Sequence, residues 1–199
     1  NLWQFHPEYH SFTPHHVSHC AGAFYTRPWK DRDSTVMVSI DGVGEHQTAV
    51  ILDNNFNLIK EWVYPKSVGL VYTDCTKALG LRPLEDEYVV MGLSSYGEVH
   101  QPMLRWLKGW YNNIPNTTDD IKEIAEDELV HIDLGTTGRV NGPNSTRVHY
   151  RADLKGKYKA VLKDGTVSRE DLAATVQEFA DWAIMDIMRE ARKYGKKLV

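Results

Sequence analysis

Cysteine, strongly basic segments and long apolar runs are all scarce in this sequence of 199 residues. The two cysteines, Cys20 and Cys75, are too few for a disulfide framework, so we expect a protein of the reducing cytoplasm. No apolar run approaches the length of a transmembrane helix, and a net charge of -4 offers no basic surface to nucleic acid. We therefore expect neither a membrane partner nor a general nucleic-acid partner.

An initiator methionine and a signal-peptide pattern are also missing. The chain begins at Asn1 inside an aromatic, irregular stretch, and residues 195–199 predict the start of a new strand after a long helix. Both ends thus lack the features of a domain boundary. We expect residues 1–199 to be an internal segment of a longer protein, with enough chain for one sizeable core.

Histidine, by contrast, is present in mild excess, with nine residues in all. His15, His16 and His19 fall within five positions. On a helix, His15 and His19 lie one turn apart on the same face, which is a typical arrangement for two metal ligands. His16 points elsewhere on such a helix and is expected to be an outer-shell or surface residue. A surface histidine pair without a metal is the alternative.

A buried strand is predicted just before Asp41, because residues 36–40 are mostly apolar. A carboxylate at the end of such a strand is well placed to complete a metal site with two histidines. Gly42 and Gly44 follow it, and glycines allow backbone N–H groups to approach a phosphate without a Cβ in the way. An ordinary strand-to-turn aspartate and a plain β-turn are the alternatives.

Hydrophobic periodicity predicts a mixture of strands and helices. Three short strands follow one another closely enough for an antiparallel meander, with an Asn-rich turn at 53–57. Ser168 is expected to cap a long amphipathic helix that Gly195 closes. The predicted strands are 35–41, 47–52 and 58–63, and the predicted helices are one from residue 15, 67–79, 85–93, 101–111 and 168–194.

The middle of the chain, at about 112–165, mixes turn residues, short apolar runs and charged patches, which predicts an inserted subdomain. Four of its lysines alternate with other residues and are expected on an exposed hairpin: Lys155, Lys157, Lys159 and Lys163. Trp106, Trp110 and Tyr111 precede this region and are expected in the core rather than on an acceptor-binding surface. Histidines elsewhere in the chain, His100, His131 and His149, are expected to be structural or exposed.

Five motifs, in order along the chain, resemble those of the O-carbamoyltransferases of the nodulation-factor and antibiotic-biosynthesis type. Together they extend over nearly the whole chain from residue 15. They are HHVSH at 15–19, IDGVGE at 40–45, YPKSVGLVY at 64–72, EYVVMGLSSYG at 87–97 and DLAATVQ at 171–177.

This resemblance implies a fold and an activity. The fold is α/β and ribonuclease-H-like, as in actin and sugar-kinase-type ATPases, of which this chain would be a part with an antiparallel meander and helices. The activity is ATP-dependent transfer of a carbamoyl group from carbamoyl phosphate, through carbamoyl-adenylate, to an acceptor hydroxyl. A separate domain would make the adenylate. The acceptor is a small molecule, and a modified nucleoside is the one nucleic-acid acceptor that the family leaves open.

The resemblance also maps a divalent metal onto His15, His19 and Asp41. Iron(II) is the expected metal by analogy, although ligation by histidine and carboxylate also suits zinc or manganese. A last metal carboxylate and the adenosine-binding element would lie beyond Val199. The lysine of the fourth family motif is replaced by Val89 or Val90, so its phosphate contact is not carried over.

Four residues next to Asp41 are further candidates. Gly42 and Gly44 are expected beside the phosphates of ATP or of the carbamoyl-adenylate. Glu45 and His46 are expected to be close enough to assist proton transfer from the acceptor hydroxyl.

Two other functions stay open at this point. A tRNA threonylcarbamoyl-transfer protein has a similar fold and histidine pair, but that group has an acidic residue inside its histidine motif, where Val17 and Ser18 stand here. A non-catalytic nucleotide-binding relative is the second alternative.

Overall fold

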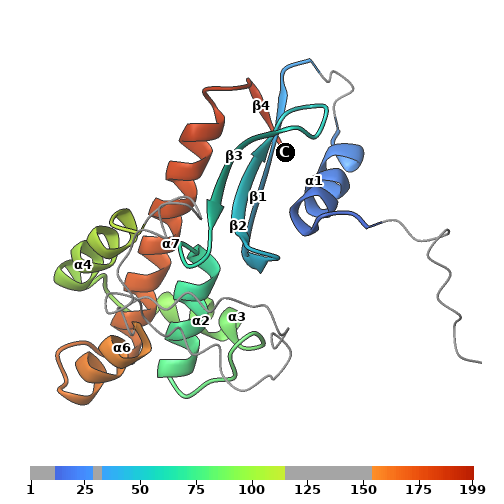
Figure 1. Ribbon diagram of the computed structural model, residues 1–199. Coiled ribbons are helices and arrows are strands. Elements are labelled where there is room, and N and C mark those ends of the chain that lie inside the picture. The colour runs from blue at the N-terminus through green and yellow to red at the C-terminus, as the bar shows by residue number, and fades with distance from the viewer. Residues whose placement is uncertain (1–11, 29–32, 115–153) are drawn as a thin grey trace, which may run out of the picture.

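The structure is a computed structural model that describes residues 12–28, 33–114 and 154–199. The described part is an α/β fold with a mixed four-stranded sheet and six helices (Figure 1). The strands are β1 (Thr35–Gly44), β2 (Gln47–Leu52), β3 (Leu58–Val63) and β4 (Lys197–Leu198), in the order β3-β2-β1-β4 across the sheet.

The first three strands form the predicted antiparallel meander. β1 pairs with β2, with Met37 opposite Leu52, and β2 pairs in turn with β3. The side chain of Asp53 accepts hydrogen bonds from the backbone N–H groups of Asn55 and Asn57, both at 2.8 Å, and so closes the turn between β2 and β3. The short β4 pairs with β1 in parallel, which confirms that a strand begins after the long helix.

Helices cover both faces of the sheet. The helix α1 (His15–Thr26) lies on one face, and α2 and α7 lie on the other (Figure 1). Side chains of β1 and β2 alternate between these faces, as the pleat of a strand requires. The remaining elements are α2 (Val68–Ala78), α3 (Glu87–Ser94), α4 (Gln101–Asn112), α6 (Leu154–Lys163) and α7 (Arg169–Ala191).

The larger core lies between the sheet and α7. The apolar stripe that makes α7 amphipathic is buried along its whole length, at Leu172, Val176, Phe179, Ala183, Ile187 and Ala191. Tyr111 packs edge-on against Phe179, and Trp106 and Trp110 pack partly buried against the same cluster, which confirms that this aromatic helix belongs to the core. As predicted, the Ser168 side chain caps α7 by accepting a hydrogen bond from the Asp171 N–H at 3.0 Å.

Two expectations about local structure were wrong. Residues 154–163 form the helix α6 rather than an exposed hairpin, because Leu154, Tyr158 and Val161 have helical spacing and are buried in the core while the lysines alternate around them. The helix α7 ends at Ala191, four residues before Gly195. Gly195 instead lies against β1, where a Cβ would be 2.8 Å from the backbone oxygen of Ser34.

Residues 115–153 of the inserted region, including His131 and His149, lie outside the described residues. Among the helices that the structure describes, none has the length and apolar character that crossing a membrane requires.

Candidate metal centre

The candidate site lies where the first turn of α1 meets the end of β1. Pro14 precedes α1 and fixes the backbone at its start, but it offers no side-chain cap. The carboxylate of Glu45, which follows β1, takes that role: its two oxygens lie 3.2 and 3.3 Å from the His15 backbone N–H that they accept. This contact holds the start of α1 beside the end of β1.

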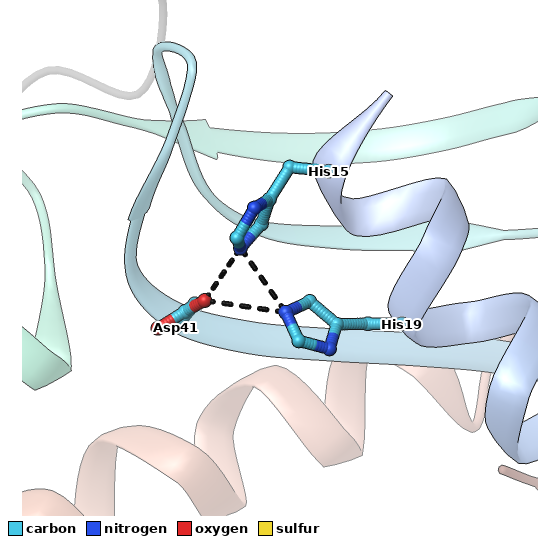
Figure 2. Close-up of side chains that lie close together, drawn as sticks. All are labelled: His15, His19 and Asp41. Carbon is cyan, nitrogen blue, oxygen red and sulfur yellow. Dashed lines mark hydrogen bonds and ion pairs between the residues drawn. The ribbon is translucent and has the colours of Figure 1, made fainter. Parts of the chain in front are cut away.

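His15, His19 and Asp41 converge as the sequence predicts. Nε2 of His15 lies 2.7 Å from Oδ2 of Asp41, and Nε2 of His19 lies 3.4 Å from the same oxygen (Figure 2). The two imidazole Nε2 atoms are 3.1 Å apart. One potential ligand atom from each residue therefore points at a common centre, and within the described part of the chain this is the one such cluster of three.

These separations suit a metal ion. Bonds of about 2.1 Å to nitrogen and oxygen give ligand-to-ligand edges of roughly 3.0 Å in an octahedron and roughly 3.4 Å in a tetrahedron. The three observed separations of 2.7, 3.1 and 3.4 Å are close to these values. The side chains are 39%, 56% and 41% exposed for His15, His19 and Asp41, which leaves one side of the cluster open to further ligands or substrate.

The environment of Asp41 favours its charged form. Partial burial acts to raise the pKa of this carboxyl, but the hydrogen bonds from His15 and from the Gly42 N–H, with the two imidazoles nearby, outweigh it and lower the pKa below its ordinary value. The Gly42 N–H donates to Oδ1 at 2.6 Å. Oδ1 is thus engaged by the backbone, while Oδ2 faces the histidines.

His16 differs from expectation, since it is neither an outer-shell nor a surface residue. It is 1% exposed, because its face of α1 packs on the sheet. Its Nε2–H donates to the backbone oxygen of Gln47 at 3.0 Å, and its Nδ1 lies 2.7 Å from the Ser39 hydroxyl. A carbonyl only accepts, so the neutral ring with hydrogen on Nε2 satisfies both contacts. His16 therefore anchors α1 to β1 and β2.

Cys20, next along this face, is buried against the sheet as expected for a packing residue. Burial raises the pKa of its thiol to about 11. The thiolate that binds metals is therefore disfavoured at neutral pH.

The four candidates beyond Asp41 fall into different surroundings. Gly44 lies under the His15 ring, where a Cβ would be 2.6 Å from the ring Cγ, whereas a Cβ on Gly42 would have no atom within 4 Å. Glu45 adopts a positive φ of 46° and binds the start of α1. His46 is 59% exposed, with Nε2 3.9 Å from a carboxylate oxygen of Glu61.

Comparison with known proteins agrees with the motifs. A sequence profile described as "Carbamoyltransferase N-terminus" matches residues 4–197. An uncharacterised protein of Synechocystis is 28% identical over 178 residues, which are 87% of this chain and 26% of that protein. The nodulation protein NolNO of Sinorhizobium fredii is 33% identical over 91 residues, which are 44% of this chain and 13% of that protein.

An uncharacterised protein of Methanocaldococcus jannaschii is 36% identical over 85 residues, which are 41% of this chain and 16% of that protein. The chain thus spans about a quarter or less of the length of these curated relatives. Because the family profile covers almost every residue of the sequence, the chain belongs to the carbamoyltransferase N-terminus family.

Proposed function

We propose that this chain is the metal-binding part of an ATP-dependent O-carbamoyltransferase. One observation carries the proposal: in a chain of this family, two histidines one helical turn apart and an aspartate of β1 direct their ligand atoms to a single point. The similarity to a nodulation protein further supports it.

In the proposed reaction, an acceptor hydroxyl attacks the carbonyl carbon of carbamoyl-adenylate. The bond from that carbon to the phosphate oxygen breaks, AMP leaves, and the hydroxyl proton passes to a base. The carbamoyl-adenylate itself would form elsewhere in the full-length protein from carbamoyl phosphate and ATP. A divalent metal bound here would act as a Lewis acid that neutralises the phosphate and polarises the carbamoyl group.

Iron(II) is the metal that we propose, because two histidines and one carboxylate with open positions are typical of non-haem iron(II) sites. Zinc and manganese are compatible with the same ligands. His15, His19 and Asp41 would hold the ion, and the exposed side of the cluster would receive the phosphate and the acceptor.

The neighbouring residues support roles in binding and in proton transfer. Gly42 has free space where a Cβ would be, so a phosphate can approach its Cα closely, beside the N–H that donates to Oδ1 of Asp41. The role of Gly44 is foremost to make room for His15. As proton acceptors, Glu45 lies at the start of α1 and His46 presents an imidazole that is more than half exposed.

We also propose that the sheet is part of a ribonuclease-H-like domain. Its support is the topology: an antiparallel meander, β1 to β3, is followed by helices and then by a strand that returns to pair with β1 in parallel. We further propose that the full-length enzyme is cytoplasmic and that its acceptor is the hydroxyl group of a small molecule, with a modified nucleoside as a further type of acceptor.

The test uses the full-length protein loaded anaerobically with iron(II). Carbamoyl phosphate-dependent release of pyrophosphate reports adenylate formation, and mass spectrometry of candidate acceptors reports the transfer. We expect both in the wild-type protein. Product that forms without metal, or without carbamoyl phosphate, would contradict the proposal, and transfer of a threonylcarbamoyl group to tRNA would replace it.

A further inference from the structure

The strand β1 departs from regular pairing at the residue that bears the candidate metal carboxylate. Ile40 pairs with Ala49 and Gly44 pairs with Gln47, so residues 41–43 lie opposite the single residue Thr48. Such a bulge interrupts the ladder of backbone hydrogen bonds and re-aims side chains. The backbone groups of the bulge, and with them the direction of the Asp41 side chain, therefore depend on partners outside the sheet.

The beginning of α2 supplies those partners. Ser67, which is 1% exposed, donates its hydroxyl hydrogen to the backbone oxygen of Gly42 at 2.6 Å. The same oxygen atom of Ser67 accepts the Leu70 N–H at 3.0 Å and so caps α2. A single buried hydroxyl thus joins the N-terminus of α2 to the bulge, using its donor and its acceptor capacity together.

Close packing adds a second constraint. A Cβ on Gly69 would be 2.7 Å from Cα and 2.8 Å from N of Gly42, so only glycine allows α2 to lie this close. The Gly42 N–H in turn donates to Oδ1 of Asp41 at 2.6 Å. A continuous series of contacts therefore links α2 to Gly42 and Gly42 to Oδ1 of Asp41. The other carboxylate oxygen, Oδ2, faces His15 and His19.

We propose that Ser67 and Gly69 are positioning residues that aim Asp41 at the metal. The inference rests on the proposed metal centre and deepens it. Ser67 and Gly69 are not proposed to touch the substrate. They fix the backbone of the bulge at Gly42, the Gly42 N–H binds Oδ1 of Asp41, and Oδ2 remains available to bind the ion. Hydrogen-bonding partners behind a metal ligand commonly change metal affinity by about 10–100-fold when they are removed.

The test measures binding of manganese(II) and of anaerobic iron(II) to the full-length protein by calorimetry. Ser67→Ala has a matched control in Ser168→Ala, because each removes the cap of a helix but only Ser67 also contacts the bulge. Both variants should lower the melting temperature. Only Ser67→Ala should weaken metal binding, by about 10–100-fold, and Ser67→Thr, which keeps the hydroxyl, should restore most of it.

Gly69→Ala provides a second test that leaves the cap intact. Its control is Gly109→Ala in α4, where a Cβ would meet no atom within 4 Å. We expect weaker metal binding for Gly69→Ala alone. Wild-type affinity in folded Ser67→Ala or Gly69→Ala would overturn the positioning role and leave the metal centre standing, whereas a wild-type protein that binds neither metal would overturn the metal centre as well.

Discussion

Gly44 lies directly beneath the imidazole of His15, so close that a Cβ at residue 44 would be 2.6 Å from the ring Cγ. The His15 backbone N–H donates to the carboxylate of Glu45, and the ring Nε2 contacts Asp41, so the ring has little freedom to move aside while His15 keeps these contacts. The glycine is therefore a steric requirement of the candidate metal centre.

Gly44→Ala should accordingly weaken metal binding. The added methyl group would displace the His15 ring from the cluster, and loss of one ligand should reduce affinity by at least the roughly 10–100-fold seen for outer contacts. Gly42→Ala is the control on the same bulge, because its Cβ would face open space. Calorimetric titration with manganese(II) compares the two, and equal affinities would show that His15 is not held as described.

Gly42→Ala also tests the proposed phosphate contact by itself. Since the substitution has room in the fold, we expect wild-type stability and metal affinity but weaker binding of a carbamoyl-adenylate analogue to the full-length protein. Unchanged binding of the analogue would place the phosphate away from this glycine.

His16 and His19 both lie on α1, but they should contribute differently to the stability of the folded protein. His16→Ala removes a buried ring and leaves the Ser39 hydroxyl and the Gln47 carbonyl without their partner, which should cost about 2–4 kcal/mol of unfolding free energy. His19→Ala removes a side chain that is 56% exposed, so it should lower the unfolding free energy by well under about 1 kcal/mol. Urea denaturation of both variants checks this, and equal losses would contradict the assigned roles.

His19→Ala should instead abolish carbamoyl transfer by the full-length protein while pyrophosphate release continues. The reason is that His19 belongs to the candidate metal centre, whereas adenylate formation is proposed to lie in a separate domain. His46→Ala is compared beside it: His46 is similarly exposed, and its imidazole faces Glu61. Retained metal binding by His46→Ala, with slower transfer, would support its proposed part in proton transfer.

The sequence carried enough information to predict that His15, His19 and Asp41 come together. The spacing of His15 and His19 places both on one helical face whatever the helix packs against, and the apolar run before Asp41 predicts a strand that leads into this residue. The meander could be predicted equally well, since short apolar runs and an Asn-rich turn between them are local signals.

The contacts that hold these side chains in place could not be predicted from the sequence in the same way. The histidine spacing does not say which side of α1 faces the sheet, and so His16 was placed wrongly on the outside. Ser67 is a typical N-cap residue, so its bond to the start of α2 is a local feature. Its second hydrogen bond goes to the backbone oxygen of Gly42, which is available because β1 is bulged there, and no short sequence motif predicts this bulge. In α6 the apolar residues have helical spacing, but the lysines at 155, 157 and 159 alternate with other residues, a pattern that also fits a strand.

A last relationship, between β3 and the end of α7, gives a prediction on pH. Both carboxylate oxygens of Glu190 bind lysines: Lys193 donates at 2.6 Å and Lys60 lies 3.2 Å away. The hydrogen bond from Lys193, with those from Lys60 and Tyr194, outweighs partial desolvation and lowers the pKa of Glu190 to about 2. The folded state therefore favours the ionised form relative to an unfolded chain, where the pKa is about 4.3.

Glu190→Gln should therefore destabilise the protein above about pH 5, where the wild-type carboxylate is charged in both states. The loss should be about 1 kcal/mol, because the lysine partners are exposed and salt screens them. As the pH falls from about 4.3 toward 2, the wild-type advantage should shrink and disappear. Urea denaturation at pH 7, 4 and 3 measures it, with Glu178→Gln, an exposed position on the same helix, as control. A difference between wild type and Glu190→Gln that stays constant across this range would mean that Glu190 acts through packing rather than through its charge.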